Sequence, residues 1–361
     1  MEISATRPSF FRRALELWDG PKVLDFWMGQ VNSLWSWDHA QAKVIERIAE
    51  AESTTTLVLK PNRKFKGFKA GQHVNIGVEL DGVRHIRSYS ASDAPRGNRR
   101  LQITVKATDS GKVSQALQTL PLGSIVSLSE AFGELALPND QHDVLMLAAG
   151  SGITPMLALI HEQADLEFPR PIRLMVWART RAQHIQAETL RALARQHPNF
   201  NVQLALTREA AQTKDELQGR INAEHLDDAL KTQPHILACG PFEFVETARA
   251  LTEQHARSFT AEAFTPPPRA QGVDTQGTAR VTLARTGVTL DVPRDVSLLE
   301  ALEAQGLKPK HGCRMGICNT CACGKKDGAT RDLHHNRIDH EAVHSVRICT
   351  HAAHSDLTLD L

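Results

Sequence analysis

The 361-residue sequence lacks the features that would assign it to a membrane, to secretion or to nucleic-acid binding. No apolar run approaches the ~18 residues of a membrane-spanning helix. No signal peptide opens the chain, because Phe10-Phe11 is followed at once by Arg12-Arg13 rather than by an apolar segment. The formal net charge is only +1, whereas nucleic-acid-binding proteins concentrate positive charge. The sequence therefore predicts a cytoplasmic protein without a nucleic-acid partner.

Cysteine is scarce, with six residues, and in a reducing cytoplasm these are expected to bind metal rather than to form disulfides. Cys313, Cys318 and Cys321 follow the spacing C-x4-C-x2-C, and Cys349 lies further downstream. Plant-type [2Fe–2S] clusters use this arrangement of thiolates. A structural zinc site would rather use two C-x2–4-C pairs. The spacing predicts these four cysteines as cluster ligands and leaves Cys323 out of register.

Two glycines suit a tight cluster loop. Gly312 precedes the first cysteine, and Gly316 lies between the first two. Glycine lets the backbone approach closely and adopt positive φ, so that amide N–H groups can turn toward the sulfurs. The run C-R-x-G-x-C-x-x-C resembles the loop of plant-type ferredoxins.

The first forty residues are rich in aromatic side chains near helical spacing, with Asp19-Gly20-Pro21 as a helix breaker. We expect a Trp-rich helical extension over residues 1–40. It either packs on the neighbouring domain or contacts a membrane surface or membrane-bound partner, where Trp is favoured. Its aromatic residues are Phe10, Phe11, Trp18, Phe26, Trp27, Trp35 and Trp37.

Residues 41–138 are rich in short β-type runs separated by turns. Evenly spaced short strands of this kind predict a small barrel or sandwich. The runs are Thr55–Leu59, Val74–Val78, Leu101–Val105 and Ile125–Leu128.

Two motifs in this region could contact a cofactor. In Arg87-Ser88-Tyr89-Ser90, the arginine and hydroxyls could hold a phosphate while the ring of Tyr89 stacks on a flat group. Gly111-Lys112-Val113-Ser114 is typical of a helix start, whose free N–H groups attract anions. Taken alone, either motif also fits an ordinary strand or helix.

Residues 139–265 change to alternating strands and helices. Val144–Ala149 is a continuous apolar run, typical of a buried parallel strand, and it leads into Gly150-Ser151-Gly152-Ile153-Thr154-Pro155. Thr154 is expected to cap the next helix and Pro155 to take its first position. The alternation predicts a parallel sheet with helices on both faces and ligands at the carboxyl ends of its strands.

Residues 266–278 are Pro-rich at their start and are expected to form a linker. Residues 279–361 begin with a predicted hairpin, Ala279–Arg285 and Val288–Val292. A helix then follows from Ser297, with Glu300 at the capping-box position. The cluster loop and a last strand near Leu357–Leu359 complete the order of an α+β ferredoxin β-grasp.

In combination, these motifs resemble the ferredoxin–NADP reductase family, here joined to a plant-type ferredoxin domain. The resemblance implies an antiparallel β-barrel for FAD over residues 41–138, an α/β NAD(P)H-binding domain over 139–265 and a [2Fe–2S] domain over 279–361. It also implies that Arg87 and Ser88 bind the flavin and its phosphate, that Tyr89 stacks on the isoalloxazine and that Ser90 bonds near its reactive edge. The residues expected at the pyrophosphate are Gly111, Lys112, Val113 and Ser114.

The same resemblance implies a nicotinamide site. Phe264 and Glu262 are expected to cover the flavin where the nicotinamide docks, with the Cys239 thiol near its ring. NADPH is favoured over NADH, because arginine suits a 2′-phosphate. The other residues implied in this site are Gly150, Gly152, Thr154 and Pro155 of G-x-G-x-T-P, Gly240 and Pro241 of C-G-P, and Arg179, Thr207 and Arg208 for the phosphate.

The implied function is electron transfer from NADPH through FAD and [2Fe–2S] to an external acceptor. The domain order is that of the phthalate dioxygenase reductase-like and phenylacetate-oxygenase reductase-like groups. The N-terminal extension and the run C-R-M-G-I-C-x-T-C-x-C look most like bacterial partners of acyl-CoA (stearoyl-CoA) desaturases. We therefore expect a membrane di-iron desaturase as acceptor, with peripheral contact at the inner face of the cell membrane through residues 1–40. The alternatives are the reductase component of a Rieske or di-iron oxygenase, and a cluster-bearing redox sensor without reductase activity.

Overall fold

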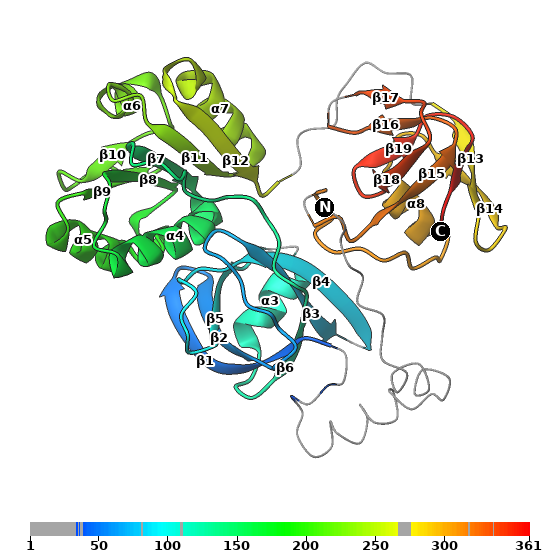
Figure 1. The fold of residues 1–361 in the computed structure, drawn as a ribbon, viewed down its shortest axis with the longest axis horizontal. Coiled ribbons are helices and arrows are strands. Elements are labelled where there is room, and N and C mark those ends of the chain that lie inside the picture. Colours follow the sequence, from blue (N-terminus) through cyan, green and yellow to red (C-terminus); the bar gives the residue numbers. More distant parts are fainter. Residues whose placement is uncertain are drawn as a thin grey trace.

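The computed structural model describes residues 34, 36, 39–80, 82–108, 111–265, 276–316, 318–334 and 336–361. These form three units, each built around its own sheet (Figure 1). The helices expected within residues 1–40, and most of the expected linker, lie outside the described residues. Within the described part of the chain, no helix combines the length and the apolar character needed to span a bilayer.

The first unit, here called the barrel, is a six-stranded antiparallel sheet in the order β4-β3-β6-β1-β2-β5. Its two edges approach each other, because Ala91, just after β4, pairs with Ile103 of β5. Leu57, Ile76 and Leu117 are fully buried in its core. The predicted antiparallel barrel is confirmed. The elements are β1 (Gln41–Ala51), β2 (Thr54–Pro61), β3 (His73–Leu80), β4 (Val83–Ser90), β5 (Leu101–Lys106), α3 (Lys112–Thr119) and β6 (Ile125–Leu128).

The second unit, the α/β unit, is a six-stranded sheet in the order β10-β9-β8-β7-β11-β12, and every pair is parallel. Its strands are β7 (Val144–Ala149), β8 (Ile172–Ala178), β9 (Phe200–Leu206), β10 (Glu216–Gln218), β11 (His235–Gly240) and β12 (Ser258–Ala263). Its helices are α4 (Ile153–Asp165), α5 (Ala187–Gln196), α6 (Ala223–Leu230) and α7 (Phe242–Thr252).

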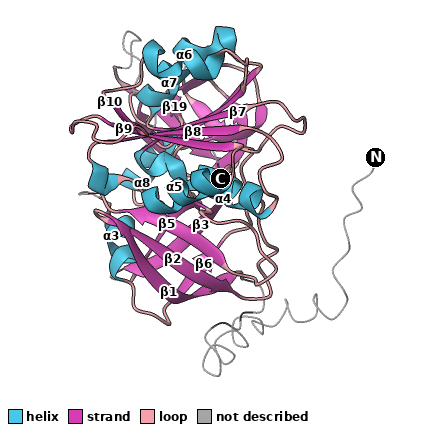
Figure 2. Ribbon diagram, turned by 90° about the vertical axis from the view of Figure 1, so that its left-hand side faces the viewer, coloured by secondary structure: helices cyan, strands magenta, loops and turns pink. Residues whose placement is uncertain are grey.

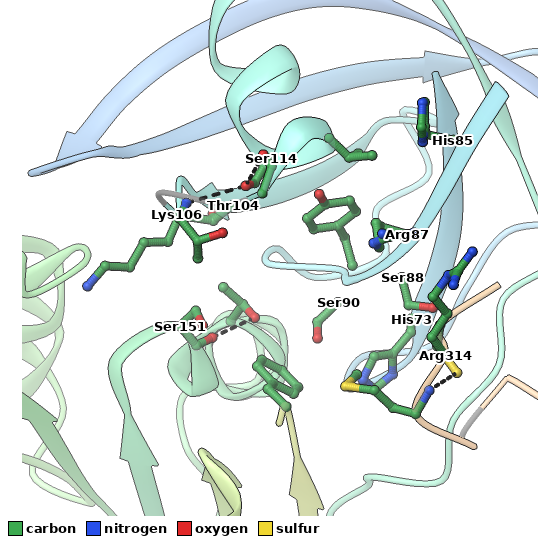
Figure 3. A pocket seen from close by; sticks show the side chains of 18 of the residues that line it. His73, His85, Arg87, Ser88, Ser90, Thr104, Lys106, Ser114, Ser151 and Arg314 are labelled. Atoms are coloured by element: carbon green, nitrogen blue, oxygen red, sulfur yellow. Dashed lines mark hydrogen bonds between the residues drawn. The ribbon is translucent and has the colours of Figure 1, made fainter. Parts of the chain in front are cut away.

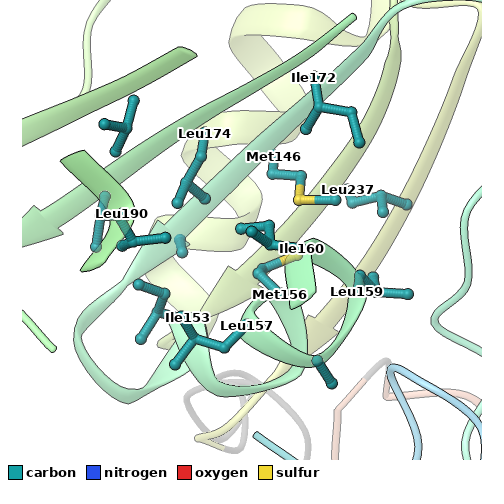
Figure 4. Close-up of a cluster of buried hydrophobic side chains, with 14 of the residues drawn as sticks. Met146, Ile153, Met156, Leu157, Leu159, Ile160, Ile172, Leu174, Leu190 and Leu237 are labelled. Carbon is teal, nitrogen blue, oxygen red and sulfur yellow. The ribbon is translucent and has the colours of Figure 1, made fainter. Parts of the chain in front are cut away.

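Both faces of this sheet are buried. Met146 of β7 packs on one face with α4 and α5, whereas Leu145 and Leu147 pack on the other with α6 and α7 (Figure 4 shows the first cluster). Alternate residues of one apolar strand therefore serve two cores, as expected for a parallel sheet covered on both sides. Helices α4 and α5 lie between the sheet and the barrel (Figure 2).

The start of α4 differs from the prediction. The helix begins at Ile153 with Gly152 as its N-cap residue, after a 3-10 turn over Gly150–Gly152. Thr154 is inside the first turn, and its hydroxyl donates to the carbonyl of Ser151 at 2.9 Å. Thr154 is therefore not the cap, because the preceding turn winds the chain into helical geometry two residues earlier.

The third unit, the C-terminal unit, has a five-stranded sheet, β14-β13-β20-β15-β18, and a small sheet, β17-β16-β19. The expected hairpin and helix are confirmed: Ser297 caps α8, with a reciprocal bond from its amide to Glu300. The elements are β13 (Thr278–Leu283), β14 (Thr289–Pro293), α8 (Leu298–Ala304), β15 (Ala322–Asp327), β16 (Thr330–Asp332), β17 (Ile338–Asp339), β18 (Val343–Arg347), β19 (His351–Ala353) and β20 (Leu357–Leu359).

Candidate functional site

A cavity of about 630 Å³ lies where the three units meet (Figure 3). The barrel supplies most of its wall, the α/β unit supplies Ser151, Thr154 and Phe264, and the C-terminal unit supplies its cluster loop. Several predicted site residues from all three units therefore share one cavity. The predicted residues that line it are Arg87, Ser88, Tyr89, Ser90, Gly111, Lys112, Val113, Ser114, Thr154, Phe264 and Cys313.

The end of β4 brings its motif to this cavity. Burial raises the pKa of Tyr89 to about 12, so its phenol stays neutral and its ring packs against the barrel core. Burial, and then the charge of Arg314, lower the pKa of Arg87. The hydroxyl of Ser90 is buried and has no hydrogen-bond partner among the described residues. A buried polar atom without a partner costs free energy, so this wall fits a polar ligand.

The start of α3 forms the opposite wall. Gly111 is the N-cap residue, and a side chain there would collide with Thr108 and Ser114. The Ser114 hydroxyl donates to the carbonyl of Gly111 at 2.9 Å and so closes the turn. The N–H groups in the first turn of a helix have no carbonyl partner within that helix. Lys112 and Val113 lie in the first turn of α3. The wall therefore fits an anionic group such as a pyrophosphate.

The G-x-G-x-T-P loop packs directly on the last central strand. A side chain at Gly152 would collide with the carbonyl of Cys239, whereas Gly150, at φ +56°, faces open space. Pro155 is buried in α4. Gly150, Gly152 and Pro155 are thus beside the cavity rather than in its lining.

The C-G-P motif ends β11. Cys239 is fully buried, and burial, followed by the charge of Glu262, raises the pKa of its thiol well above the ordinary value. Gly240 accepts a bond from the amide of Phe264 at 2.8 Å, and Pro241 precedes α7 as its N-cap residue. The thiol is therefore neutral and sits behind Phe264, not in the cavity lining.

His73 was missed by sequence reasoning. It lines the cavity from β3, opposite Ser90 in the strand register, and its Nε2 is 2.9 Å from Oε2 of Glu262. Its ring stacks on Phe132 and meets Phe264 edge-on at 6.3 Å between centroids. No sequence signal could identify it, because a histidine in an alternating strand looks like any half-buried strand residue.

Three residues predicted for a 2′-phosphate lie at the carboxyl ends of β8 and β9, outside the cavity lining. Arg179, Thr207 and Arg208 are exposed, and the amide of Arg208 donates to the carbonyl of Arg179 at 2.9 Å. Arg179 also lies near the cavity residue Lys106, whose pKa is lowered by burial and then by this arginine. Unlike these three residues, Arg181 forms an ion pair within the α/β unit, with Glu216 at 2.7 Å. These three exposed residues therefore form an edge beside the cavity, here called the cationic edge, to which the two arginines contribute positive charge.

The four predicted cluster cysteines form two contacting pairs, Cys313 with Cys318 and Cys321 with Cys349. The amides of Met315 and Cys318 donate to the sulfur of Cys313 at 3.3 and 3.4 Å. Two pairs of thiolates fit the two irons of a [2Fe–2S] cluster.

Cys323 is not in either pair. It lies on β15 in the core of the C-terminal unit, where burial raises the pKa of its thiol to about 12. Its position outside both pairs, on a strand rather than in the cluster loop, does not fit a ligand role.

The chain matches three domain families: the oxidoreductase FAD-binding domain over residues 41–136, the oxidoreductase NAD-binding domain over 146–250, and the 2Fe-2S iron-sulfur cluster binding domain over 281–353. It is 30% identical over 356 residues to the NADPH oxidoreductase of Mycobacterium tuberculosis, covering 94% of this chain and 89% of that relative. It is 27% identical to the glycine betaine monooxygenase reductase subunit of Pseudomonas aeruginosa, covering 81% of this chain and 87% of that relative. The solved structure of phthalate dioxygenase reductase shares the fold, with a TM-score of 0.63 and 22% identity over 89% of this chain and 97% of that one.

Proposed function

The chain belongs to the family of NAD(P)H oxidoreductases that carry FAD and a [2Fe–2S] cluster, and from this we propose that it is the reductase component of an oxygenase system. The observation that carries the proposal is the shared cavity, which brings the R-x-Y-S strand and the first cluster cysteine together. A flavin held in this cavity would lie next to the cluster loop, whose Cys313, Arg314 and Met315 line the same cavity.

We assign FAD binding to residues 41–138. Arg87 and the first-turn amides of α3 are suited to the two ends of a diphosphate, because both present positive charge or free donors to the cavity. Ser88 and Ser90 offer hydroxyls along the same strand, and Tyr89 offers a neutral ring for stacking.

We assign NADPH binding to residues 139–265. Arg179, Thr207 and Arg208 would hold the 2′-phosphate at the exposed edge, while the G-x-G-x-T-P loop allows close backbone approach. Phe264 would cover the flavin face until the nicotinamide displaces it, with Glu262 and the Cys239 thiol behind it. The half-buried ring of Phe264, packed over the buried Cys239, would also keep water away from the reacting face.

When bound, FAD accepts a hydride from the nicotinamide and releases electrons singly, which is how a [2Fe–2S] centre takes them. The chain's own part is to position these groups. Ser90 supplies a free hydroxyl at the cavity wall, and Glu262 holds a carboxylate at its edge within ion-pair distance of His73. Residues 279–361 would hold the cluster, with Cys313 and Cys318 on one iron and Cys321 and Cys349 on the other.

An oxygenase component is the acceptor best supported by the relatives. The Pseudomonas aeruginosa relative is named as a monooxygenase reductase subunit, and the similar solved structure is a dioxygenase reductase. The desaturase expected from the N-terminal extension and the cluster-loop run has no such support, because the relatives named here are not described as desaturase partners.

Reconstitution tests the acceptor. The purified holoenzyme should oxidise NADPH faster than NADH when a one-electron dye is present, and should then support turnover of an oxygenase component but not of an acyl-CoA desaturase. Turnover with the desaturase alone would overturn the oxygenase assignment. A cluster spectrum without flavin or NADPH-driven dye reduction would instead identify a sensor.

A further inference from the structure

The cluster loop touches the barrel at one point outside the cavity. A side chain at Gly312 would lie 2.8 Å from Nδ2 of Asn75 and 3.1 Å from Oγ1 of Thr320. Both distances are shorter than ordinary van der Waals contact, so the loop backbone at Gly312 lies close against the Asn75 amide, and a side chain there would displace it. Gly312 therefore serves contact between two units as well as loop geometry.

Asn75 joins the two units through its side chain. Its Nδ2 donates to Oγ1 of Thr320 at 3.4 Å, and its Oδ1 accepts a short bond from the hydroxyl of Ser88. Thr320 lies between Cys318 and Cys321, which belong to different thiol pairs. Ser88 lies next to Tyr89 in the flavin-binding strand. One carboxamide thus links the strand at the cavity to the loop that carries the cluster ligands.

The barrel holds this carboxamide rigidly. Asn75 is 7% exposed and is paired with Ser88 in the β3–β4 register. Its backbone exchanges two bonds with Ser129, at 2.9 Å and 3.0 Å. Because the backbone is fixed on both sides, the side chain has little freedom to follow the loop if the loop moves.

Charge does not provide this attachment. Arg314 of the cluster loop lies on the same side of the cavity as Arg87 and Ser88 (Figure 3), and its charge opposes that of Arg87. Its neutralising partner, Glu303, bonds to it at 2.6 Å from within the C-terminal unit. Glu303 also attracts Arg87, so the charges at this contact oppose one another, and the bond from Asn75 to Thr320 that crosses it is a neutral one.

We propose that Asn75 is a positioning residue that docks the cluster loop on the flavin-binding barrel and so sets the rate of electron transfer between them. The proposal rests on the proposed function for its redox consequence, but not for the docking itself. The electron balance is unchanged: NADPH supplies two electrons, and the acceptor protein takes them one at a time. What changes with Asn75 is the fraction of molecules in which the cluster loop lies at the cavity.

The test compares Asn75→Leu, Thr320→Val and the double variant in the full-length holoenzyme. Leucine keeps the branched shape of asparagine, although it is bulkier, and removes both side-chain bonds, while valine keeps the shape of threonine and removes the acceptor. Asn199→Leu is the matched control, because its amide bonds to the carbonyl of Phe168 at 3.0 Å within the α/β unit. Stopped-flow absorbance separates flavin reduction by NADPH from the later reduction of the cluster.

We expect flavin reduction to stay within about twofold of wild type, and cluster reduction to fall about tenfold or more in each single variant, because the side-chain bond that holds the loop on the barrel is lost. The double variant should fall by less than the product of the two single effects, since both substitutions break the Asn75–Thr320 bond and only Asn75→Leu also loses the bond with Ser88. Cluster reduction within twofold of wild type in both single variants would overturn the proposal.

A second readout does not depend on activity. Amide hydrogen exchange over residues 312–320 and 83–90 should rise in Asn75→Leu and Thr320→Val and stay unchanged in Asn199→Leu. If wild-type flavin is not reduced by NADPH, the proposed function fails, yet this exchange still decides the docking contact. Unchanged exchange in Thr320→Val, which leaves the barrel intact, would refute it.

Discussion

The surroundings of each cysteine decide its chemistry. The sulfurs of Cys313 and Cys318 accept amide N–H bonds from their own loop, and the contact between the two side chains lowers the pKa of Cys318 while it raises that of Cys313. Cys321 is likewise in contact with Cys349, whereas Cys323, two residues after Cys321, belongs to neither pair. Pairing between thiols, and not burial, therefore distinguishes these neighbouring positions.

Serine substitutions should distinguish a predicted cluster ligand, such as Cys318, from Cys323, which is not predicted to bind the cluster. Cys318→Ser should lose the visible absorption and electron paramagnetic resonance signal of the cluster, because it removes one thiolate of a pair. NADPH-driven reduction of ferricyanide at the flavin should persist. Cys323→Ser is the control and should retain the cluster. Loss of the cluster in Cys323→Ser with retention in Cys318→Ser would reverse the ligand assignment.

Single side chains are also expected to decide whether the protein prefers NADPH or NADH. Arg208 is exposed and has no ion-pair partner among the described residues. Arg208→Ala should raise KM for NADPH about tenfold or more and leave KM for NADH unchanged, because a charge-assisted bond to phosphate is worth ~1.5–3 kcal/mol. Steady-state kinetics with both cofactors measure this, with exposed Arg195→Ala as the control. Equal effects on both cofactors would show that Arg208 does not contact the 2′-phosphate.

At the scale of elements, strand register aligns residues that are far apart in the sequence. The β11–β12 register places Cys239 opposite Glu262, and the β3–β4 register places His73 opposite Ser90. The α5–β10 region is arranged by charge instead, because Arg181 and Arg191 both reach the buried carboxylate of Glu216. This pairing fixes the loop beside the cationic edge.

Low pH should destabilise the α5–β10 region before the rest of the protein. Hydrogen bonds from Arg181 lower the pKa of Glu216 to about 2, against an ordinary value of 4.5. A depressed folded-state pKa stabilises the protein fully above about pH 4.5, and this contribution is lost as pH falls toward 2. Glu216→Gln should therefore lower the melting temperature at pH 7 and flatten its decline in acid, as followed by circular dichroism. Exposed Glu134→Gln should do neither, and an unchanged acid slope in Glu216→Gln would contradict the pairing.

At the scale of the whole molecule, the apolar core of the C-terminal unit is separate, because its cluster contains no residue before Ala279. The barrel and the α/β unit share apolar packing instead, since Ala70 and Leu135 of the barrel lie in one buried cluster with Met146. The C-terminal unit meets the barrel at the cavity and at the Asn75 contact. Such an arrangement lets the C-terminal unit fold on its own core.

Removal of the C-terminal unit should show that the rest of the chain folds without it. A chain of residues 1–265 should fold, bind FAD and reduce ferricyanide with NADPH at a rate near that of the full chain. It should fail to support an acceptor that requires the cluster. Absorbance, a thermal melt and dye reduction check these outcomes. An insoluble or flavin-free product would show that the C-terminal unit is needed to complete the cavity.

Local sequence patterns were enough to predict much of this architecture. Apolar periodicity and turn residues predicted the barrel strands, the parallel sheet and the capping box at Ser297, because these depend on neighbours within a few residues. The ligand set expected from cysteine spacing stays a prediction, and three of its four residues share one loop. The cap at Thr154 was misjudged, because a 3-10 turn begins the helix earlier.

Only the tertiary structure decided which distant residues meet. His73 against Glu262, Asn75 against Gly312 and Thr320, and the outward placement of Arg179 and Arg208 all arise from pairing or packing between segments far apart in the chain. Sequence pattern records the faces of strands and helices, whereas the contacts between units depend on how those faces are brought together.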